Sequence, residues 1–573
     1  MLLSQITPGL STPVASAVNR LLKLDQLDSL YQRARSGKPL AGELLRELDI
    51  TVQIADADLT RVPKAGPVIA VSNHPFGLLD GVVLTDMLTR LRSDVRILTN
   101  GMLGTVPELA EICIFVDPFD RRENRAANAR SLREAITHVK SGGLLLIFPA
   151  GEVSHFDPKG AAVRDPAWRE TAARLVRVTR ARVIPIYVQG SNSLSFQMLG
   201  LIHARLRTAA IPGEFLNKRG HAVEVRIGSP IEASRISAFD TDAQAIAYLR
   251  RRSEWMAGRG AVAGHEIDES VPVETGVASS LFADEIARLP ELCLLARAGE
   301  LEVYVAEAPR IPCVLREIGR LRELTFRAVR EGTGRALDLD RFDEYYLHLF
   351  AWNRERREVV GAYRMGIIPH ILLRFGTAGL YTNTQFRFDE RFFKQLGPAI
   401  ELGRSFVRVE YQRQFMPLAL LWRGVCAWIA RRPEYATLIG AVSVSRQYSK
   451  CSRELIAAYF GMPDGTASRV RARKPLRAKP MKGTLPLGVE DLSEWISDVE
   501  ADRKGLPVLV RQYVKLGGRI LAFSVDPAFG DTLDGLVRMD LRLARRESLE
   551  RYMGRAEAAG FLAWHGTAGH VAA

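Results

Sequence analysis

The chain has 573 residues, of which 47% are apolar and 25% charged, a globular mixture that is too long for a single hydrophobic core. Its 79 Lys and Arg outnumber 65 Asp and Glu, and the net charge of +14 favours an anionic partner such as nucleic acid, an acidic carrier protein or an anionic membrane leaflet. The N-terminal residues lack the pattern of a secretory signal, and no apolar run reaches the ~18 residues of a membrane span. We therefore expect a cytoplasmic protein of two or more domains.

Five cysteines are scattered along the chain without a CxxC or other metal-ligand spacing. Such a scatter is typical of buried thiols in a reducing compartment, so we expect neither a disulfide framework nor a metal site. The cysteines are Cys113, Cys293, Cys313, Cys426 and Cys451.

The composition changes near residues 257–280, where small and polar residues replace periodic apolar ones. Such a change is typical of a linker between domains. We predict a first domain at 1–265, a linker at 266–280 and a second domain at 281–573.

Short apolar runs alternate with amphipathic segments such as 123–142 in the first domain. This alternation predicts an α/β fold with a mixed or mostly parallel sheet flanked by helices. Ligands of such sheets bind beyond the carboxyl ends of the strands, so three polar loops that follow strands should converge there. The predicted strands are 67–72, 95–99, 113–117, 142–149 and 182–188.

The loop after the first of these runs reads HPFGLLD, with five residues between His74 and Asp80. A histidine can remove a proton from a hydroxyl, and a carboxylate on its other nitrogen orients the ring and stabilises the imidazolium. Gly77 and Gly81 would let the backbone bend and approach a substrate. Alternatively, His74 ends a strand and Asp80 caps the following helix. The residues alone leave both interpretations open.

Four stretches, HPFGLLD, FVDPFDRR, FPAGEVSH and VIPIYVQGSN, resemble in their order the motifs of the lysophospholipid and glycerol-phosphate acyltransferase family, over about residues 60–230. The resemblance implies that His74 is the general base and that Asp80 orients it, although the family has only four residues between the two. The third motif implies substrate-binding residues Phe148, Pro149, Gly151 and Glu152.

In that third motif the chain has Ala150 where the family has a glutamate, and the acid lies at Glu152. The variant resembles the branch that acylates hydroxyl groups of acyl amino acids. Arg121 and Arg122, in the second motif, would bind an anionic head group or would simply begin a solvated helix. His155 is a rival base that we expect to be structural.

The second half is similar, over most of residues 285–560, to the hemolysin-type N-acyltransferases that make acyl amino acid lipids, relatives of acyl-homoserine-lactone synthases. The similarity is spread over several blocks, from LEVYVAEAP at 301–309 to VDPAFGDTLDGLVRMDL at 525–541. It implies a second α/β domain of the GNAT type.

Amide formation needs an amine without its extra proton, held beside a thioester carbonyl, and carboxylates can attract and deprotonate an ammonium group. We predict Asp343 and Glu401 as catalytic and Asp338 and Asp340 as substrate-binding. Alternatively, the aspartates lie in a solvated loop before a helix over 341–350. Glu401 would then form a salt bridge with Arg404.

Two arginines with apolar and aromatic neighbours, Arg327 and Arg364, would pair with these aspartates or with a substrate carboxylate. Ion pairing is the expected role for at least one of them. Arg364 is our candidate for substrate binding.

We expect no cofactor and an acyl thioester donor, with acyl carrier protein favoured over coenzyme A. The one match to the pyrophosphate loop of GNAT enzymes, RYMGRA at 551–556, lies in a helical stretch. The segment 466–482 has seven basic residues and no acid. It would bind the acidic carrier or an anionic leaflet, or form a solvated loop. We expect no nucleic acid, because the segment has no interleaved aromatic residues.

The two halves together resemble the bifunctional ornithine lipid synthases. By that resemblance the second domain joins a 3-hydroxyacyl chain to the amine of ornithine, and the first domain esterifies the hydroxyl of the lyso-lipid at the inner face of the cytoplasmic membrane. The alternatives are another product such as a glycine lipid, a glycerophospholipid acyltransferase with a non-catalytic second domain, and a signal synthase or membrane-active toxin.

Overall fold

The computed structural model describes residues 23–35, 37, 39–101, 104, 106–117, 125–158, 160–260, 271–461, 469–477 and 484–566. They form two compact units. The first unit contains the described residues up to Arg259 together with 484–486 and Ser497–Val499, and the second contains the others. Residues 271–278, in the predicted linker, have no helix or strand, and Val271 N–H donates to Gly334 O over 3.2 Å.

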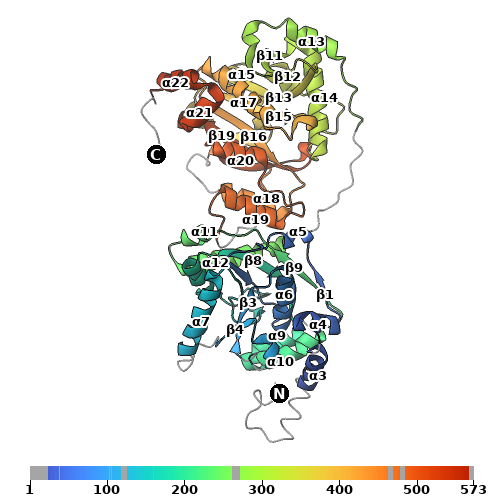
Figure 1. The fold of residues 1–573 in the computed structure, drawn as a ribbon. Helices are drawn as coiled ribbons and strands as arrows, with labels where there is room; N and C mark the ends of the chain where they lie inside the picture. Colours follow the sequence, from blue (N-terminus) through green and yellow to red (C-terminus); the bar gives the residue numbers. More distant parts are fainter. Residues whose placement is uncertain are drawn as a thin grey trace. The chain divides into compact units, whose positions relative to one another are not determined.

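A mostly parallel sheet of seven strands forms the centre of the first unit (Figure 1). Its order is β1-β9-β8-β2-β5-β3-β4, and every pair of neighbours is parallel except β8 and β9. The five predicted strands are confirmed as β2, β3, β4, β5 and β8. The bounds are β1 Thr51–Gln53, β2 Val68–Ser72, β3 Val95–Asn100, β4 Cys113–Val116, β5 Leu144–Ile147, β8 Arg182–Val188 and β9 Ala222–Ile227.

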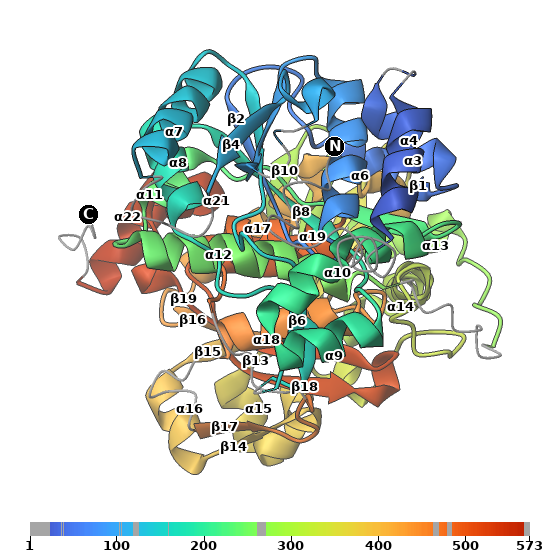
Figure 2. The same ribbon diagram turned by 90° about the horizontal axis from the view of Figure 1, so that it is seen from below.

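Helices cover both faces of this sheet. Val68 and Ala70 of β2 are buried in one cluster with Leu79 of α6, and the alternating residues Ile69 and Val71 point to the opposite face, where α8 and α12 contact β2. The helices are α3 Leu24–Ala34, α4 Leu40–Glu47, α5 Asp56–Leu59, α6 Leu78–Leu91, α7 Arg125–Lys140, α8 Thr171–Thr179, α9 Leu194–Ile202, α10 Ala204–Asn217, α11 Ala233–Ser237 and α12 Asp242–Trp255. A hairpin of β6, His155–Asp157, and β7, Ala162–Arg164, completes the unit, and Figure 2 shows β6 beside α9.

The carboxyl ends of β8, β2 and β5 lie at one edge of the sheet, because these adjacent strands are parallel. Asn73 joins two of the loops there: its Nδ2 donates to Val188 O over 2.9 Å, and Val188 N–H donates to its Oδ1 over 2.7 Å. The predicted convergence of the three polar loops is therefore confirmed.

The second unit is built on an eight-stranded sheet of order β10-β11-β12-β13-β15-β16-β19-β18. Only β15 and β16 are parallel; their neighbours are antiparallel. The bounds are β10 Leu294–Ala298, β11 Leu301–Glu307, β12 Leu347–Asn353, β13 Glu358–Ile367, β15 Ala399–Val407, β16 Thr437–Val444, β18 Arg519–Asp526 and β19 Thr532–Asp540; a separate pair is β14 Phe386–Phe388 with β17 Val470–Ala472.

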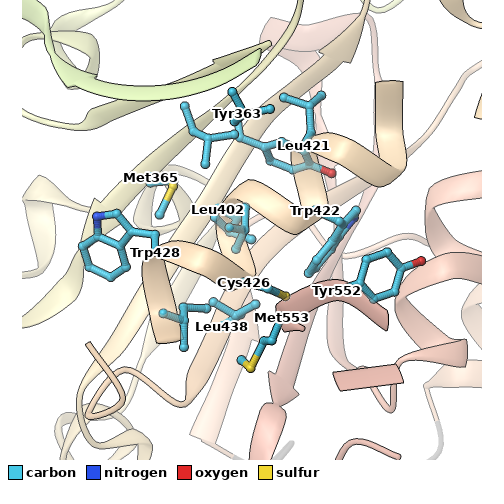
Figure 3. Close-up of a cluster of buried hydrophobic side chains, with 14 of the residues drawn as sticks. Tyr363, Met365, Leu402, Leu421, Trp422, Cys426, Trp428, Leu438, Tyr552 and Met553 are labelled. Atoms are coloured by element: carbon cyan, nitrogen blue, oxygen red, sulfur yellow. The ribbon is translucent and has the colours of Figure 1, made fainter. Parts of the chain in front are cut away.

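The apolar helix α17 packs on this sheet (Figure 3). Trp422 and Cys426 of α17 are buried with Leu402 of β15 and Leu438 of β16. The helices from residue 279 on are α13 Ser279–Ala287, α14 Pro312–Ala328, α15 Ile368–Phe375, α16 Glu390–Leu396, α17 Phe415–Ala430, α18 Lys450–Phe460, α19 Val489–Val499, α20 Val508–Lys515, α21 Arg546–Met553 and α22 Arg555–Trp564.

The alternative prediction of a helix over residues 341–350 is wrong. Only a short 3-10 turn, Arg341–Glu344, forms there, and the following residues enter β12. Residues 348–353 are all buried, because Leu349 and Ala351 pack with α17 on one face of the sheet and Phe350 and Trp352 pack with α14 on the other. A strand buried on both faces carries a continuous apolar run, which its sequence pattern does not distinguish from a buried helix.

All five cysteines are free, but only Cys113 and Cys426 are buried; the other three are partly exposed, so the prediction of buried thiols is wrong for those three. In the described part of the chain, no helix is both long and apolar enough to span a bilayer. The interrupted stretch 417–430 lies in α17, where Arg423 is exposed.

Candidate active sites

The predicted pair of the first unit comes into contact. Nδ1 of His74 lies 3.0 Å from Oδ2 of Asp80, with the aspartate side chain fully buried and 18% of the histidine side chain exposed. The additional residue between them is accommodated at Gly77, which has φ +84°. A Cβ at Gly77 would lie only 2.9 Å from Val153 Cγ2, so the loop needs glycine there. The histidine and the carboxylate thus lie as close together as a base and its orienting acid must.

Asp80 also binds the start of α6, so both sequence interpretations describe it. It is the third residue of the helix, and its Oδ2 accepts the N–H groups of Phe76 and Gly77 over 2.9 Å each. Burial raises the pKa of Asp80, while His74 and the two N–H groups oppose that shift. Gly81, by contrast, lies inside α6 and makes no bend.

The backbone of His74 is fixed by a residue that sequence reasoning missed, Asp165. Its Oδ1 accepts His74 N–H over 3.2 Å, and its Oδ2 accepts the Trp168 indole N–H over 2.8 Å. Ser154 N–H donates to His74 O over 2.8 Å. The imidazole packs on Phe148, with ring centroids 4.2 Å apart. No motif marks Asp165, because His74 lies 91 residues before it in the chain.

The third motif forms a tight turn next to two cations. Gly151 has φ +67°, and its N–H donates to Phe148 O over 3.0 Å. Arg169 N–H donates to Pro149 O over 2.9 Å, and the Arg169 guanidinium lies beside Gly151. Glu152 pairs with Arg207 of α10 over 2.8 Å. Both arginines were missed by the sequence analysis.

Arg121 and Arg122 lie outside the described residues, so their role stays a prediction. His155 begins β6, and its Nδ1 lies 3.2 Å from Val153 O. This backbone contact accords with the structural role that we expect for it.

Of the aspartates predicted in the second unit, Asp338 and Asp343 are buried among arginines rather than solvated, and Asp340 is partly exposed beside them. Asp343 lies 2.8 Å from Arg322 and 3.2 Å from Arg364, and Arg364 also binds Asp340 over 2.6 Å. Asp338 lies 3.3 Å from Arg404. Burial works to raise the pKa of Asp343, but Arg322 and Arg364 outweigh it and hold that pKa well below its ordinary value.

Glu401 does not pair with Arg404, so the alternative considered for it is wrong. Its carboxylate accepts the Tyr346 hydroxyl, the Thr382 N–H over 2.7 Å and the Tyr381 N–H over 3.1 Å. It therefore holds the turn that begins at Tyr381 against the sheet.

The contacts of two further residues, Arg327 and His348, were not predicted from the sequence. Arg327 pairs with Glu323 over 2.6 Å. His348 was missed; its Nε2 lies 2.9 Å from Asp343 O, and burial lowers its pKa to about 4, which keeps the ring neutral at pH 7. Among the described residues, no group of three or more His, Cys, Asp or Glu side chains is placed to hold a metal ion.

Two family models match separate parts of the chain. "Acyltransferase" matches residues 45–260, and "Acetyltransferase (GNAT) domain" matches residues 321–423. Together with the two sheets, these matches confirm the expected fold, an α/β acyltransferase domain followed by a GNAT domain.

Relatives with both kinds of activity in their names are similar to the chain. A "Glycine N(alpha)-acyltransferase" of Phocaeicola vulgatus is 31% identical over 250 residues, 40% of this chain and 77% of the relative. A "Lyso-glycine lipid O-acyltransferase" of the same organism is 26% identical over 246 residues, 41% of this chain and 85% of the relative.

A solved 1-acyl-sn-glycerophosphate acyltransferase of Thermotoga maritima is 17% identical and covers 41% of this chain and 81% of its own, but its TM-score of 0.27 is too low to support an argument. The identity and coverage of the match to the Phocaeicola vulgatus N-acyltransferase are high enough to show a shared family. The chain is an acyltransferase and belongs to the family of that enzyme.

Proposed function

We propose that this protein is a bifunctional acyltransferase that makes an acyl amino acid lipid in two steps. The second unit joins a 3-hydroxyacyl chain to the amine of an amino acid, and the first unit esterifies the hydroxyl of that product. The observation that carries the proposal is the His74 and Asp80 pair at the converging strand ends of one unit, in a chain whose other part matches a GNAT domain. The names of the two relatives support the same pair of reactions.

In the ester-forming step, His74 accepts the proton of the lyso-lipid hydroxyl while the hydroxyl oxygen attacks the thioester carbonyl. The new C–O bond forms, the C–S bond breaks, and the thiolate takes the proton from the imidazolium. Asp80 stabilises that imidazolium at 3.0 Å. Arg169 and Arg207, beside the third motif, are the cations that we propose for the carboxylate of the acyl amino acid.

For the amino acid we propose ornithine, from the resemblance of the whole chain, with glycine as the alternative named by the relatives. The test incubates purified protein with 3-hydroxyacyl carrier protein and either amino acid, then adds a second acyl thioester and identifies products by mass spectrometry. His74→Ala should accumulate the monoacylated amino acid. Diacylated product from that variant would refute the assignment of the first unit, and consumption of lysophosphatidate without amino acid acylation would favour the glycerophospholipid alternative.

For the donor we propose acyl carrier protein rather than coenzyme A. The RYMGRA match lies at the junction of α21 and α22 without a preceding strand, which argues against a pyrophosphate loop there. In the basic segment, residues 470–472 form β17 beside β14, and Arg471 is exposed on it. Such an ordered basic strand supports the docking of an acidic protein better than it supports a solvated loop.

We further propose that the protein binds peripherally to an anionic membrane through α9 and the start of α10. Five large apolar side chains are exposed there, with 84% exposure of Leu194 and 73% of Ile202 as the highest values. In residues 193–221 the sequence has four Lys or Arg and one acid, Glu214, which is buried and bound to Ser193. The face is therefore apolar, and the segment that carries it holds more basic than acidic residues, which suits an anionic leaflet. The apolar residues are Leu194, Met198, Leu201, Ile202 and Leu206.

Sedimentation with phosphatidylglycerol and phosphatidylcholine vesicles tests this surface. Leu194→Ser combined with Ile202→Ser should reduce binding to anionic vesicles at least tenfold, because each side chain contributes roughly 1.5 kcal/mol or more on burial. Leu543→Ser, at a residue with 81% exposure in the second unit, is the matched control and should bind as the wild type does. Equal binding of all three proteins would refute the proposed surface.

A further inference from the structure

A group of buried carboxylates in the second unit lies apart from the predicted aspartates. Asp534 lies on β19 and Asp526 ends β18, and the Gln385 amide joins them: its Nε2 donates to Asp526 Oδ2 over 2.7 Å and to Asp534 Oδ2. Glu331 follows α14, and only 9% of it is exposed. Its loop packs against the turn at Gly530, where an added Cβ would lie 2.4 Å from Arg330 O.

Two acceptor atoms of this group have no donor in hydrogen-bonding geometry. Among the described residues, Gln385 Oε1 and Asp534 Oδ1 are buried and accept no hydrogen bond, although Ser443 and Thr532 lie close enough to Asp534 for their hydroxyls to lower its pKa. Asp534 is 2% exposed and Gln385 4%. Buried acceptors without a donor are costly, so they indicate a ligand rich in N–H groups. An ammonium group has three donors and no acceptor, which matches this set.

We propose that Glu331, Asp534 and Gln385 bind the ammonium group of the amino acid acceptor, and that Glu331 takes its proton. The inference rests on the proposed amide-forming function of the second unit. It assigns the proton acceptor to a residue other than Asp343 and Glu401, whose oxygens already bind arginines, N–H groups and a tyrosine.

The charges around Glu331 favour a cation. Asp534 faces it from β19, and the guanidinium of Arg404 on β15, which also serves Asp338, is the cation that acts on it most directly. Burial and the nearby Asp534 raise the pKa of Glu331 to about 8, and burial together with Asp526 raises the pKa of Asp534 to about 6. The other ionisable groups facing this cluster are Tyr381 after α15, Tyr448 after β16 and Arg453 of α18.

These two pKa values indicate different roles for the two carboxylates. Asp534 is ionised at neutral pH and holds the ammonium, whereas Glu331 has a proton affinity close to that of an α-amino group, whose pKa is about 8 in peptides and higher in a free amino acid. Proton transfer between groups of similar pKa needs little free energy, which is the condition for an effective general base.

The acyl chain would approach from the other face of the same sheet. The strands β15 and β16 pair only from Ala399 with Thr437 to Glu401 with Ile439, and each then continues along a different neighbour. A cavity of about 20 Å³ lies at this separation, lined by apolar side chains that include Val537 and Met539 of β19. Because strand residues alternate, Asp534 points to the opposite face from these two.

In the reaction, the Glu331 carboxylate removes one proton from the ammonium, and the free amine attacks the thioester carbonyl. A C–N bond forms and the C–S bond breaks. The thiolate leaves with the second proton of the nitrogen, and Glu331 returns the first proton to solvent. The products are an amide and a thiol, so atoms and charges balance without a further reactant.

The test measures initial rates of N-acylation with the full-length protein, 3-hydroxyacyl carrier protein and glycine or ornithine, from pH 6 to 9. Glu331→Gln should lower kcat at least 100-fold, and Asp534→Asn should raise the KM for the amino acid at least tenfold. Asp531→Asn is the matched control, because this exposed neighbour pairs with Arg446. O-acylation of a synthetic lyso-lipid should stay within twofold in all three variants, which shows that the first unit is intact, and an unchanged circular dichroism spectrum shows that the second unit is folded.

The pH dependence gives a second readout. Wild-type N-acylation should rise with an apparent pKa near 8, and Asp534→Asn should lower that pKa, because it removes a negative charge beside Glu331. Glu331→Gln with more than a third of the wild-type rate would overturn the inference.

Binding separates this inference from the proposed function. Calorimetric titration of the wild type with methylammonium, glycine and ornithine should show an amine that binds and that Asp534→Asn no longer binds. If an amine binds in this way but no amide forms, the proposed function fails and the site stands. If no amine binds to the wild type, the site itself is refuted.

Discussion

Replacing Asp80 by asparagine separates its two contacts. The asparagine oxygen can still accept the N–H groups of Phe76 and Gly77, so the start of α6 keeps its hydrogen bonds. The variant loses the negative charge 3.0 Å from His74. At an effective dielectric constant of about 20, two unit charges 3.0 Å apart attract each other by about 5 kcal/mol, which at ~1.4 kcal/mol per decade is a rate factor of between 10³ and 10⁴.

This substitution should change the free energy of unfolding only slightly. Because burial raises the pKa of Asp80, its site favours a neutral group, and a neutral amide fits there. We expect the free energy of unfolding of Asp80→Asn to lie within about 1 kcal/mol of the wild type. Asp80→Ala removes both acceptor contacts, and we expect it to lose about 2–3 kcal/mol.

The assay follows esterification of a lyso acyl amino acid by mass spectrometry and the unfolding of each variant by circular dichroism. Amide formation in the second unit should be unchanged and serves as the internal control. Asp86→Asn, on the same helix but paired with Arg90, is the matched variant and should keep its activity. If Asp80→Asn kept more than a tenth of the wild-type esterification rate, Asp80 would be a helix cap and nothing more.

Three further substitutions test other parts of the molecule. Asp343→Asn removes the counter-charge of the buried Arg322 and one of the two carboxylates that pair with Arg364, so we expect a loss of about 3–5 kcal/mol in the free energy of unfolding at pH 7. Since the folded-state pKa of Asp343 lies below its ordinary value of 3.8, the difference in unfolding free energy between variant and wild type should shrink as pH falls below about 4. Loss of amide formation at unchanged stability would instead support the prediction from sequence that Asp343 is catalytic. Phe148→Ala removes the ring on which His74 packs and should slow esterification about tenfold or more, whereas Phe148→Leu should recover part of that rate; equal rates would show that the contact orients nothing. Arg471→Glu should raise the KM for acyl carrier protein about tenfold at low salt and leave the KM for acyl-coenzyme A unchanged; an equal effect on both donors would contradict docking at β17.

The strands and motif loops of the first unit were predicted correctly, because their signals are local. Each apolar run is short and ends in a polar loop, and parallel pairing puts those loops at one edge. The contact between His74 and Asp80 was also predictable in kind. Its geometry was not, because the longer spacing works only with the positive φ at Gly77.

In the second unit the local sequence pattern was insufficient to predict the strand β12 and the partners of Glu401. The run at 347–353 is mostly apolar, with His348 and Asn353 as its polar members, because helices cover both faces of β12, and this position follows from long-range packing. The partners of Glu401 are also set by tertiary structure, since the turn at Tyr381 takes both of its oxygens. Arg404, three residues away in the sequence, lies beside Asp338 instead.

The sequence by itself determined that the chain has an acyltransferase-like part with a histidine and an aspartate near a strand end, and a GNAT-like part with an acidic stretch at 338–343. Residue identity and spacing carry that information, because strands, loops and motifs are written in neighbouring residues. Only the tertiary structure decided which carboxylates are neutralised. Asp343 meets two arginines, whereas Asp534 raises the pKa of the buried Glu331, and such environments are assembled from strands and loops that lie far apart in the chain.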